Sequence, residues 1–128
     1  MDEETVLETV AEIARSVREY LATRDDYGEI VGRKHGDETR KIDIIADKML
    51  ENILFENGIC ARIISEEFGD RIFPEGGKPE GTLIFDPIDG STNLSHNIPF
   101  FCTSLAYSPK TKDAGFDDIE MGAVACVA

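Results

Sequence analysis

Two aspartates three residues apart follow an apolar stretch in the segment TLIFDPIDGSTNLSHNIPF, residues 82–100. Carboxylates are costly to bring together unless a cation lies between them. The proline between Asp86 and Asp89 stiffens the backbone, and the carbonyl oxygen of Ile88 offers a further hard ligand. Magnesium prefers such oxygen ligands and keeps several water molecules in its shell. The segment therefore predicts a magnesium site.

Three more acids are expected to lie where other elements begin or end. Asp43 opens an apolar pattern typical of a helix, and the pair Glu66 and Glu67 follows the apolar stretch ARIIS at 61–65. Carboxylates that come from separate elements suit the octahedral shell of magnesium, and one aspartate can bridge two ions. These residues are candidate partners of Asp86.

A candidate phosphate site directly follows the second aspartate. Gly90, Ser91 and Thr92 are expected to begin one helical turn, whose backbone N–H groups would bind an anion. Cation ligands and anion donors within a few residues suit metal-assisted hydrolysis of a phosphate ester. An EF-hand is excluded, because the twelfth position counted from Asp86 is Asn97 instead of glutamate. The D-x-x-D spacing also disfavours a covalent aspartyl intermediate, which needs D-x-D.

Each acid also has a purely structural interpretation. Asp-Pro and Asp-Gly pairs are common in turns, and a glutamate pair is compatible with a solvated strand end. An aspartate such as Asp43 favours a helix N-terminus with or without a nearby ion. Taken together, with apolar stretches leading into two of the sites, the acids favour a metal-assisted function.

The elements that must position these residues follow from the spacing of apolar residues and from glycine and proline. Helices are expected at 4–22 and at 42–57, the second ending before Gly58. Strands are expected at 61–65, 82–85, 100–108 and 119–128. The segment 23–41 is interpreted as a loop or a loose hairpin, and 68–81 and 109–118 as loops or turns.

Composition narrows the range of partners. The 128 residues carry a formal net charge of −13, which repels nucleic acid and anionic membranes. The charge would also repel a phosphorylated substrate unless bound cations reverse the local field. No apolar run approaches membrane-spanning length and the acidic N-terminus is unlike a signal peptide, so we expect a cytoplasmic protein. The three cysteines (Cys60, Cys102, Cys126) lie in apolar contexts and are expected to be buried, reduced thiols; a disulfide between two of them stays open without sequence support.

Three blocks of the sequence resemble one known family. FDPIDGSTN resembles the D-P-[IL]-D-G-[ST] signature of the inositol monophosphatase superfamily of magnesium-dependent, lithium-sensitive phosphatases. IISEEFG and IDIIADKMLENIL resemble its acidic pair and its metal-proximal helix. The resemblance is nearest to the archaeal enzymes that act on both inositol monophosphate and fructose 1,6-bisphosphate. It implies an α+β fold, the N-terminal portion of layered helices on a mostly antiparallel sheet.

The resemblance also implies a set of metal ligands. Glu66, Asp86 and the carbonyl of Ile88 would hold the first magnesium ion, and Asp89 would bridge to a second. Glu67 would contact a ligand instead of the ion. The complete site would hold two or three magnesium ions, and lithium is expected to inhibit it.

Catalytic roles are implied in the same way for three residues. Gly90 and Ser91 would bind the substrate phosphate through their N–H groups, and the Ser91 hydroxyl would orient the attacking water. Asp43 would bind a further ion through water or accept a proton. The substrate would be a small phosphorylated polyol or sugar.

Members of the superfamily continue with a W-D-x-A-A-G block that carries another ligand, whereas this sequence has no tryptophan. We therefore expect residues 1–128 to be the N-terminal, metal- and phosphate-binding half of a sugar-phosphatase domain, with the C-terminal half absent. Three hypotheses remain open: a phosphatase, a binding half that is inactive without its complement, and an inert remnant. The expected protein partner is a second copy in a homodimer or a complementary C-terminal half.

Overall fold

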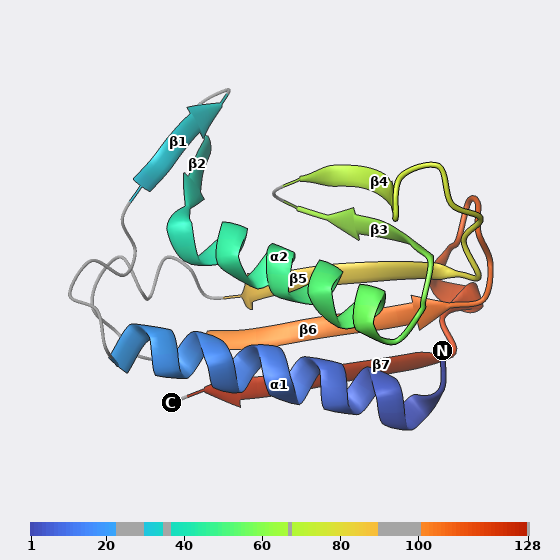
Figure 1. The fold of residues 1–128 in the computed structure, drawn as a ribbon, viewed down its shortest axis with the longest axis horizontal. Coiled ribbons are helices and arrows are strands. Elements are labelled where there is room, and N and C mark those ends of the chain that lie inside the picture. Colours follow the sequence, from blue (N-terminus) through green and yellow to red (C-terminus); the bar gives the residue numbers. More distant parts are fainter. Residues whose placement is uncertain (23–29, 35–36, 67, 90–100, 128) are drawn as a thin grey trace.

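The computed structural model describes residues 1–22, 30–34, 37–66, 68–89 and 101–127 (Figure 1). The elements are, in order, α1 (Glu3–Ala22), β1 (Ile30–Lys34), β2 (Asp37–Arg40), α2 (Lys41–Glu56), β3 (Ala61–Ser65), β4 (Gly69–Phe73), β5 (Thr82–Asp89), β6 (Phe101–Ser108), the 3-10 helix Phe116–Asp118 and β7 (Met121–Val127). Five strands form one sheet in the order β4-β3-β5-β6-β7, in which only β3 and β5 are parallel. The expected α+β class with a mostly antiparallel sheet is confirmed.

The two helices cover one face of the sheet (Figure 1). Apolar residues three and four apart turn one stripe of each helix toward the strands, as in Val10 and Ile13 of α1 and Leu50 and Leu54 of α2, all almost fully buried. The helix ends also follow the sequence. The Asp2 carboxylate accepts a hydrogen bond from the N–H of Thr5 at 2.8 Å. No helix in the described ranges is long and apolar enough to cross a membrane.

The residues of the five-stranded sheet alternate between its two faces. Phe85 and Leu105 are almost fully buried against the helices. On the opposite face, which we call the outer face, Ile64, Ile84 and Val124 are 37%, 40% and 65% exposed. Among the described residues, no α-helix covers this outer face, although Phe116 of the 3-10 helix lines one pocket with Ile84. An apolar surface therefore adjoins the acids.

Two expectations need correction: the loop expected at 68–81 and the turn expected directly after the strand at 82–85. Residues 68–81 contain β4, which pairs with β3 in register through a turn that ends at Gly69, whose φ of 72° suits glycine. Pairing with a preformed neighbour outweighs a locally unfavourable composition. The strand expected at 82–85 instead continues to Asp89, so the two aspartates lie inside β5. In the segment 23–41, residues 30–34 and 37–40 form β1 and β2, which pair antiparallel, and Lys41 begins α2.

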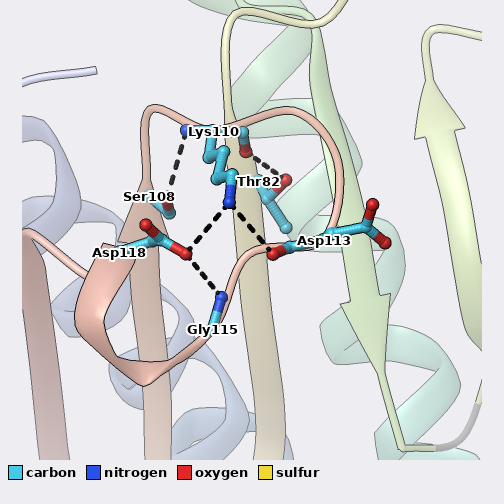
Figure 2. Close-up of polar contacts among 6 residues, drawn as sticks. All are labelled: Thr82, Ser108, Lys110, Asp113, Gly115 and Asp118. Atoms are coloured by element: carbon cyan, nitrogen blue, oxygen red, sulfur yellow. Dashed lines mark hydrogen bonds and ion pairs between the residues drawn. The ribbon is translucent and has the colours of Figure 1, made fainter.

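The connection between β6 and β7 is turn-rich, as expected, and closes on itself (Figure 2). The Lys110 ammonium donates to the carbonyl of Asp113 at 3.4 Å and to Asp118 Oδ2 at 3.5 Å. The same Asp118 oxygen accepts from the N–H of Gly115 at 2.8 Å, and the Thr82 hydroxyl donates to the Lys110 carbonyl at 2.7 Å. These contacts fix the end of the sheet opposite to the end of β5 (Figure 1).

The expectation that the cysteines are buried was wrong. All three are free thiols, but Cys60 and Cys102 are only half-buried and Cys126 is exposed. An apolar pattern such as GAVACVA does not say which face of a strand is covered. Cys102 and Cys126 occupy the alternation positions that point to the outer face.

Candidate functional site

The one parallel pair of strands brings two acids side by side. Ser65 of β3 pairs with Phe85 of β5, so Glu66 and Asp86 are the next residues of two neighbouring strands that run in the same direction. Both line a depression of about 450 Å³ on the outer face. Expecting Glu66 and Asp86 to lie close together is therefore consistent with the register of the sheet.

A β-bulge brings the second aspartate to the same face. Asp86 lies opposite Ser104 and Asp89 lies opposite Cys102, so β5 advances three residues while β6 advances two. In a regular strand, residues three apart point to opposite faces. The extra residue in the bulge restores the parity, and both aspartates point to the outer face.

A buried hydroxyl supports the bulge. Thr103 is fully buried, and its Oγ1 donates to the carbonyl of Pro87 at 2.8 Å, between the two aspartates. Pro87 has no N–H to give to a strand ladder, and its buried carbonyl takes a hydrogen bond from the Thr103 side chain. Sequence reasoning missed Thr103, although the alternation in FFCTSLAYS places it on the inner face.

Replacing Thr103 with valine keeps the shape of the side chain and removes this hydrogen bond. We expect a loss of about 1–2 kcal/mol in the free energy of unfolding, because the buried Pro87 carbonyl loses its partner. We also expect severalfold weaker magnesium binding. Urea unfolding and a magnesium titration measure the two effects. Thr103→Ser retains the hydroxyl and should bind magnesium like the parent; equal binding by the valine variant would exclude a positioning role.

Two neighbouring acids act electrostatically on Asp86. Burial raises the pKa of Asp86 above its ordinary value, and the negative charges of Glu66 and Asp89 raise it further. A hydrogen bond from the N–H of Ile88 lowers that pKa in part. A carboxylate that is half-buried and faces two like charges is costly without a cation, so the arrangement favours binding one.

The donors fit magnesium in their chemistry, although they do not enclose an ion. In the described ranges, no group of three or more His, Cys, Asp or Glu side chains is arranged so that it could hold a metal ion. Magnesium commonly uses only one or two carboxylates and keeps several waters. Asp86 with Glu66 or Asp89 meets that requirement, and the hard oxygen donors disfavour soft metals.

The remaining predicted residues divide into two groups. Asp43 is buried in the first turn of α2, at the same end of the molecule as the end of β5 (Figure 1). Asp43 is not among the described charges that shift Asp86, so its place near the ion stays a prediction. Glu67, Gly90 and Ser91 lie outside the described residues.

Sequence reasoning also missed an ion pair one turn further along α2. Asp47 is 5% exposed, and its Oδ2 lies 2.5 Å from a guanidinium nitrogen of Arg71 in β4. The same nitrogen lies 3.2 Å from Glu51 Oε1. Burial raises the pKa of Asp47 although Arg71 opposes the shift. The ion pair links α2, the helix that carries Asp43, to β4 of the sheet. It was missed because β4 itself was not expected.

Comparison with known proteins identifies relatives for most of the chain. Residues 5–120 match the family model described as fructose-1,6-bisphosphatase, N-terminal domain. A fructose-1,6-bisphosphatase/inositol-1-monophosphatase of Methanothermobacter thermautotrophicus is 35% identical over 104 residues, which cover 80% of this chain and 37% of that protein. A bifunctional NADP phosphatase/NAD kinase of Methanocaldococcus jannaschii is 44% identical over 73 residues, covering 56% and 12%.

The fold has solved counterparts as well. The extragenic suppressor protein SuhB of Bartonella henselae superposes with a TM-score of 0.68 at 23% identity, covering 94% of this chain and 42% of that one. This similarity concerns the fold alone. The chain therefore spans well under half the length of these relatives.

Proposed function

Because the chain belongs to the family of the fructose-1,6-bisphosphatase N-terminal domain, within the inositol monophosphatase superfamily, we propose that it serves magnesium-dependent hydrolysis of phosphate monoesters. The observation that carries the proposal is the arrangement of Asp86. Asp86 adjoins Glu66 where the parallel pairing of β3 and β5 ends, and the bulge turns Asp89 to the same face. Three negative charges on one face support cation binding.

In this proposal Glu66, Asp86 and the Ile88 carbonyl hold a magnesium ion, and Asp89 reaches toward a second. A bound magnesium ion supplies Lewis-acid activation of the ester and of water. The N–H of Ile88 orients the Asp86 carboxylate by a hydrogen bond. Glu67 is proposed to contact one of the magnesium ligands instead of the ion itself.

The phosphate side of the proposal rests on three residues whose roles are inferred from the family signature. Gly90 and Ser91 bind the phosphate oxygens through their N–H groups, and the Ser91 hydroxyl orients the attacking water. Asp43 accepts a proton or binds a further ion through water. The overall charge of −13 supports a cation at this site, because the protein would otherwise repel a phosphate ester.

We further propose that residues 1–128 act as the N-terminal, metal- and phosphate-binding half of a longer sugar-phosphatase domain. The match to a model of an N-terminal domain and the 37% share of the archaeal relative support this arrangement. The exposed apolar outer face next to the site supports it as well. The alternative is a binding half that is inactive until a partner chain completes it. Homodimerisation and a cytoplasmic location belong to the same proposal.

The substrate is proposed to be a small polyol or sugar phosphate, as the names of the archaeal relative suggest. The NADP phosphatase/NAD kinase, at 44% identity over the shared segment, favours a second candidate, the 2′-phosphate of a dinucleotide. Both are phosphate monoesters, so the same ligands serve either one.

To test the proposal, residues 1–128 are fused to the remaining C-terminal part of the Methanothermobacter relative, and phosphate release by the fusion protein is measured. Fructose 1,6-bisphosphate, inositol 1-phosphate and NADP are supplied with and without magnesium. We expect magnesium-dependent release from one or more of them, and loss of that release in Asp86→Asn. Release without magnesium, or release that survives Asp86→Asn, would contradict the proposal. Magnesium binding by the 128-residue chain without release would support the inactive-half alternative.

A further inference from the structure

Two cysteines face each other directly across neighbouring strands. Cys102 of β6 is the register partner of Cys126 of β7, and their Sγ atoms are 2.6 Å apart. This separation is only about half an ångström longer than a disulfide bond, which is about 2.0 Å. Directly opposite residues of an antiparallel pair bring their Cβ atoms near the range that a disulfide requires.

The position of the pair makes it accessible to small molecules. Both side chains lie on the outer face of the sheet, where Cys126 is exposed and Cys102 is half-buried. A dissolved reagent can therefore reach Cys126 first, and Cys102 is already in place for the second step. Cys102 is also the cross-strand partner of Asp89, so the pair adjoins the candidate metal site.

We propose that Cys102 and Cys126 form a reversible cross-strand disulfide by exchange with a low-molecular-weight disulfide. The Cys126 thiolate attacks one sulfur of the reagent, forming a mixed disulfide and releasing one small thiol. Cys102 then attacks the Cys126 sulfur and releases the second small thiol. The two protein thiols lose two electrons and two protons, and the reagent disulfide is reduced to two thiols.

Cys60 provides an internal control for this proposal. It precedes β3, at the end of the sheet opposite to the cysteine pair, and is half-buried. If the positions of the sulfur atoms in the folded sheet determine which disulfide forms, Cys60 should stay a free thiol. If oxidation is not selective, all three thiols should be oxidised.

The test equilibrates the 128-residue chain with mixtures of reduced and oxidised glutathione, traps free thiols with an alkylating agent and maps them by mass spectrometry. The reduced chain should take three alkyl groups, and the oxidised chain should take one, on Cys60. Cys60→Ser should form the disulfide like the parent. Cys126→Ser should form none within the chain.

A second measurement separates the native geometry from mere proximity along the chain. The effective concentration of the two thiols should be at least about tenfold higher in buffer than in concentrated urea, because the folded sheet holds the sulfurs together. An equal or lower value in buffer would overturn the proposal. Pairing of Cys60 with either partner to a similar extent under native conditions would overturn it as well.

Discussion

Asp86→Asn is expected to raise the thermal midpoint of the metal-free chain and to abolish its rise with magnesium. The pKa of Asp86 is raised in the folded state, so between 3.8 and that higher value the folded chain binds more protons than the unfolded chain. The stability of the metal-free chain therefore falls as pH rises through this window. At neutral pH the charged Asp86 carboxylate destabilises the metal-free folded state, and asparagine removes that charge.

The expected gain in the free energy of unfolding is small, roughly 0.5 kcal/mol, because the site is partly solvated. The expected loss of magnesium affinity is at least about tenfold, because a charged ligand is removed. Differential scanning fluorimetry with and without magnesium at neutral pH measures both effects. A gain in metal-free stability together with a loss of magnesium affinity is the expected signature of a metal ligand. A variant that is less stable than the parent and still gains stability from magnesium would show that Asp86 has a structural role instead.

Arg71→Met is expected to cause the largest loss of stability among the polar substitutions considered. Asp47 would keep its charge in a site where it is only 5% exposed, without the guanidinium that lies 2.5 Å away. Breaking a fully buried pair costs about 3–5 kcal/mol, and here we expect about 2 kcal/mol, because Arg71 and Glu51 are partly solvated. Urea unfolding at neutral pH measures the difference.

The pH dependence distinguishes an unpaired charge from a simple loss of packing. Arg71 lowers the pKa of Asp47, so its removal lets the folded state take up a proton more readily above 3.8. The cost of Arg71→Met should therefore be smaller near pH 5 than near pH 7. Adding Asp47→Asn should remove this dependence. Arg62→Met, which breaks the exposed pair with Asp70 and a hydrogen bond to the Thr111 carbonyl, should cost less at both pH values. Equal costs of Arg71→Met at both pH values would contradict the explanation.

The elements with strong periodicity were predictable from the sequence. The spacing of apolar residues gave both helices within about a residue, and Gly58 marked the end of the second with its φ of 65°. The strand at 61–65 was also predictable, because it is apolar and bounded by turns. In these segments the local preference and the packed structure agree, so local reasoning is sufficient.

Other parts of the fold and site depend on pairing between distant segments. β4 forms because β3 offers a partner, although residues 68–81 are rich in glycine and proline. Nothing in D-x-x-D indicates that a bulge will put Asp86 and Asp89 on one face, since three-residue spacing predicts opposite faces in a strand. The Thr103 contact with Pro87 joins residues 16 apart and follows from that bulge. Residue types and spacing therefore led to a hypothesis for the chemistry of the acids but not to their geometry in the sheet.

The most direct test of the central claim is a manganese(II) titration of the 128-residue chain, followed by the electron paramagnetic resonance signal of the free ion and by competition with magnesium. Asp86→Asn is compared with Asp117→Asn, which removes the same charge from an exposed residue of the 3-10 helix between β6 and β7. We predict a site that magnesium displaces, weakened at least about tenfold by Asp86→Asn and unchanged by Asp117→Asn. Equal binding by the parent and both variants would mean that the ends of β3 and β5 do not hold the ion.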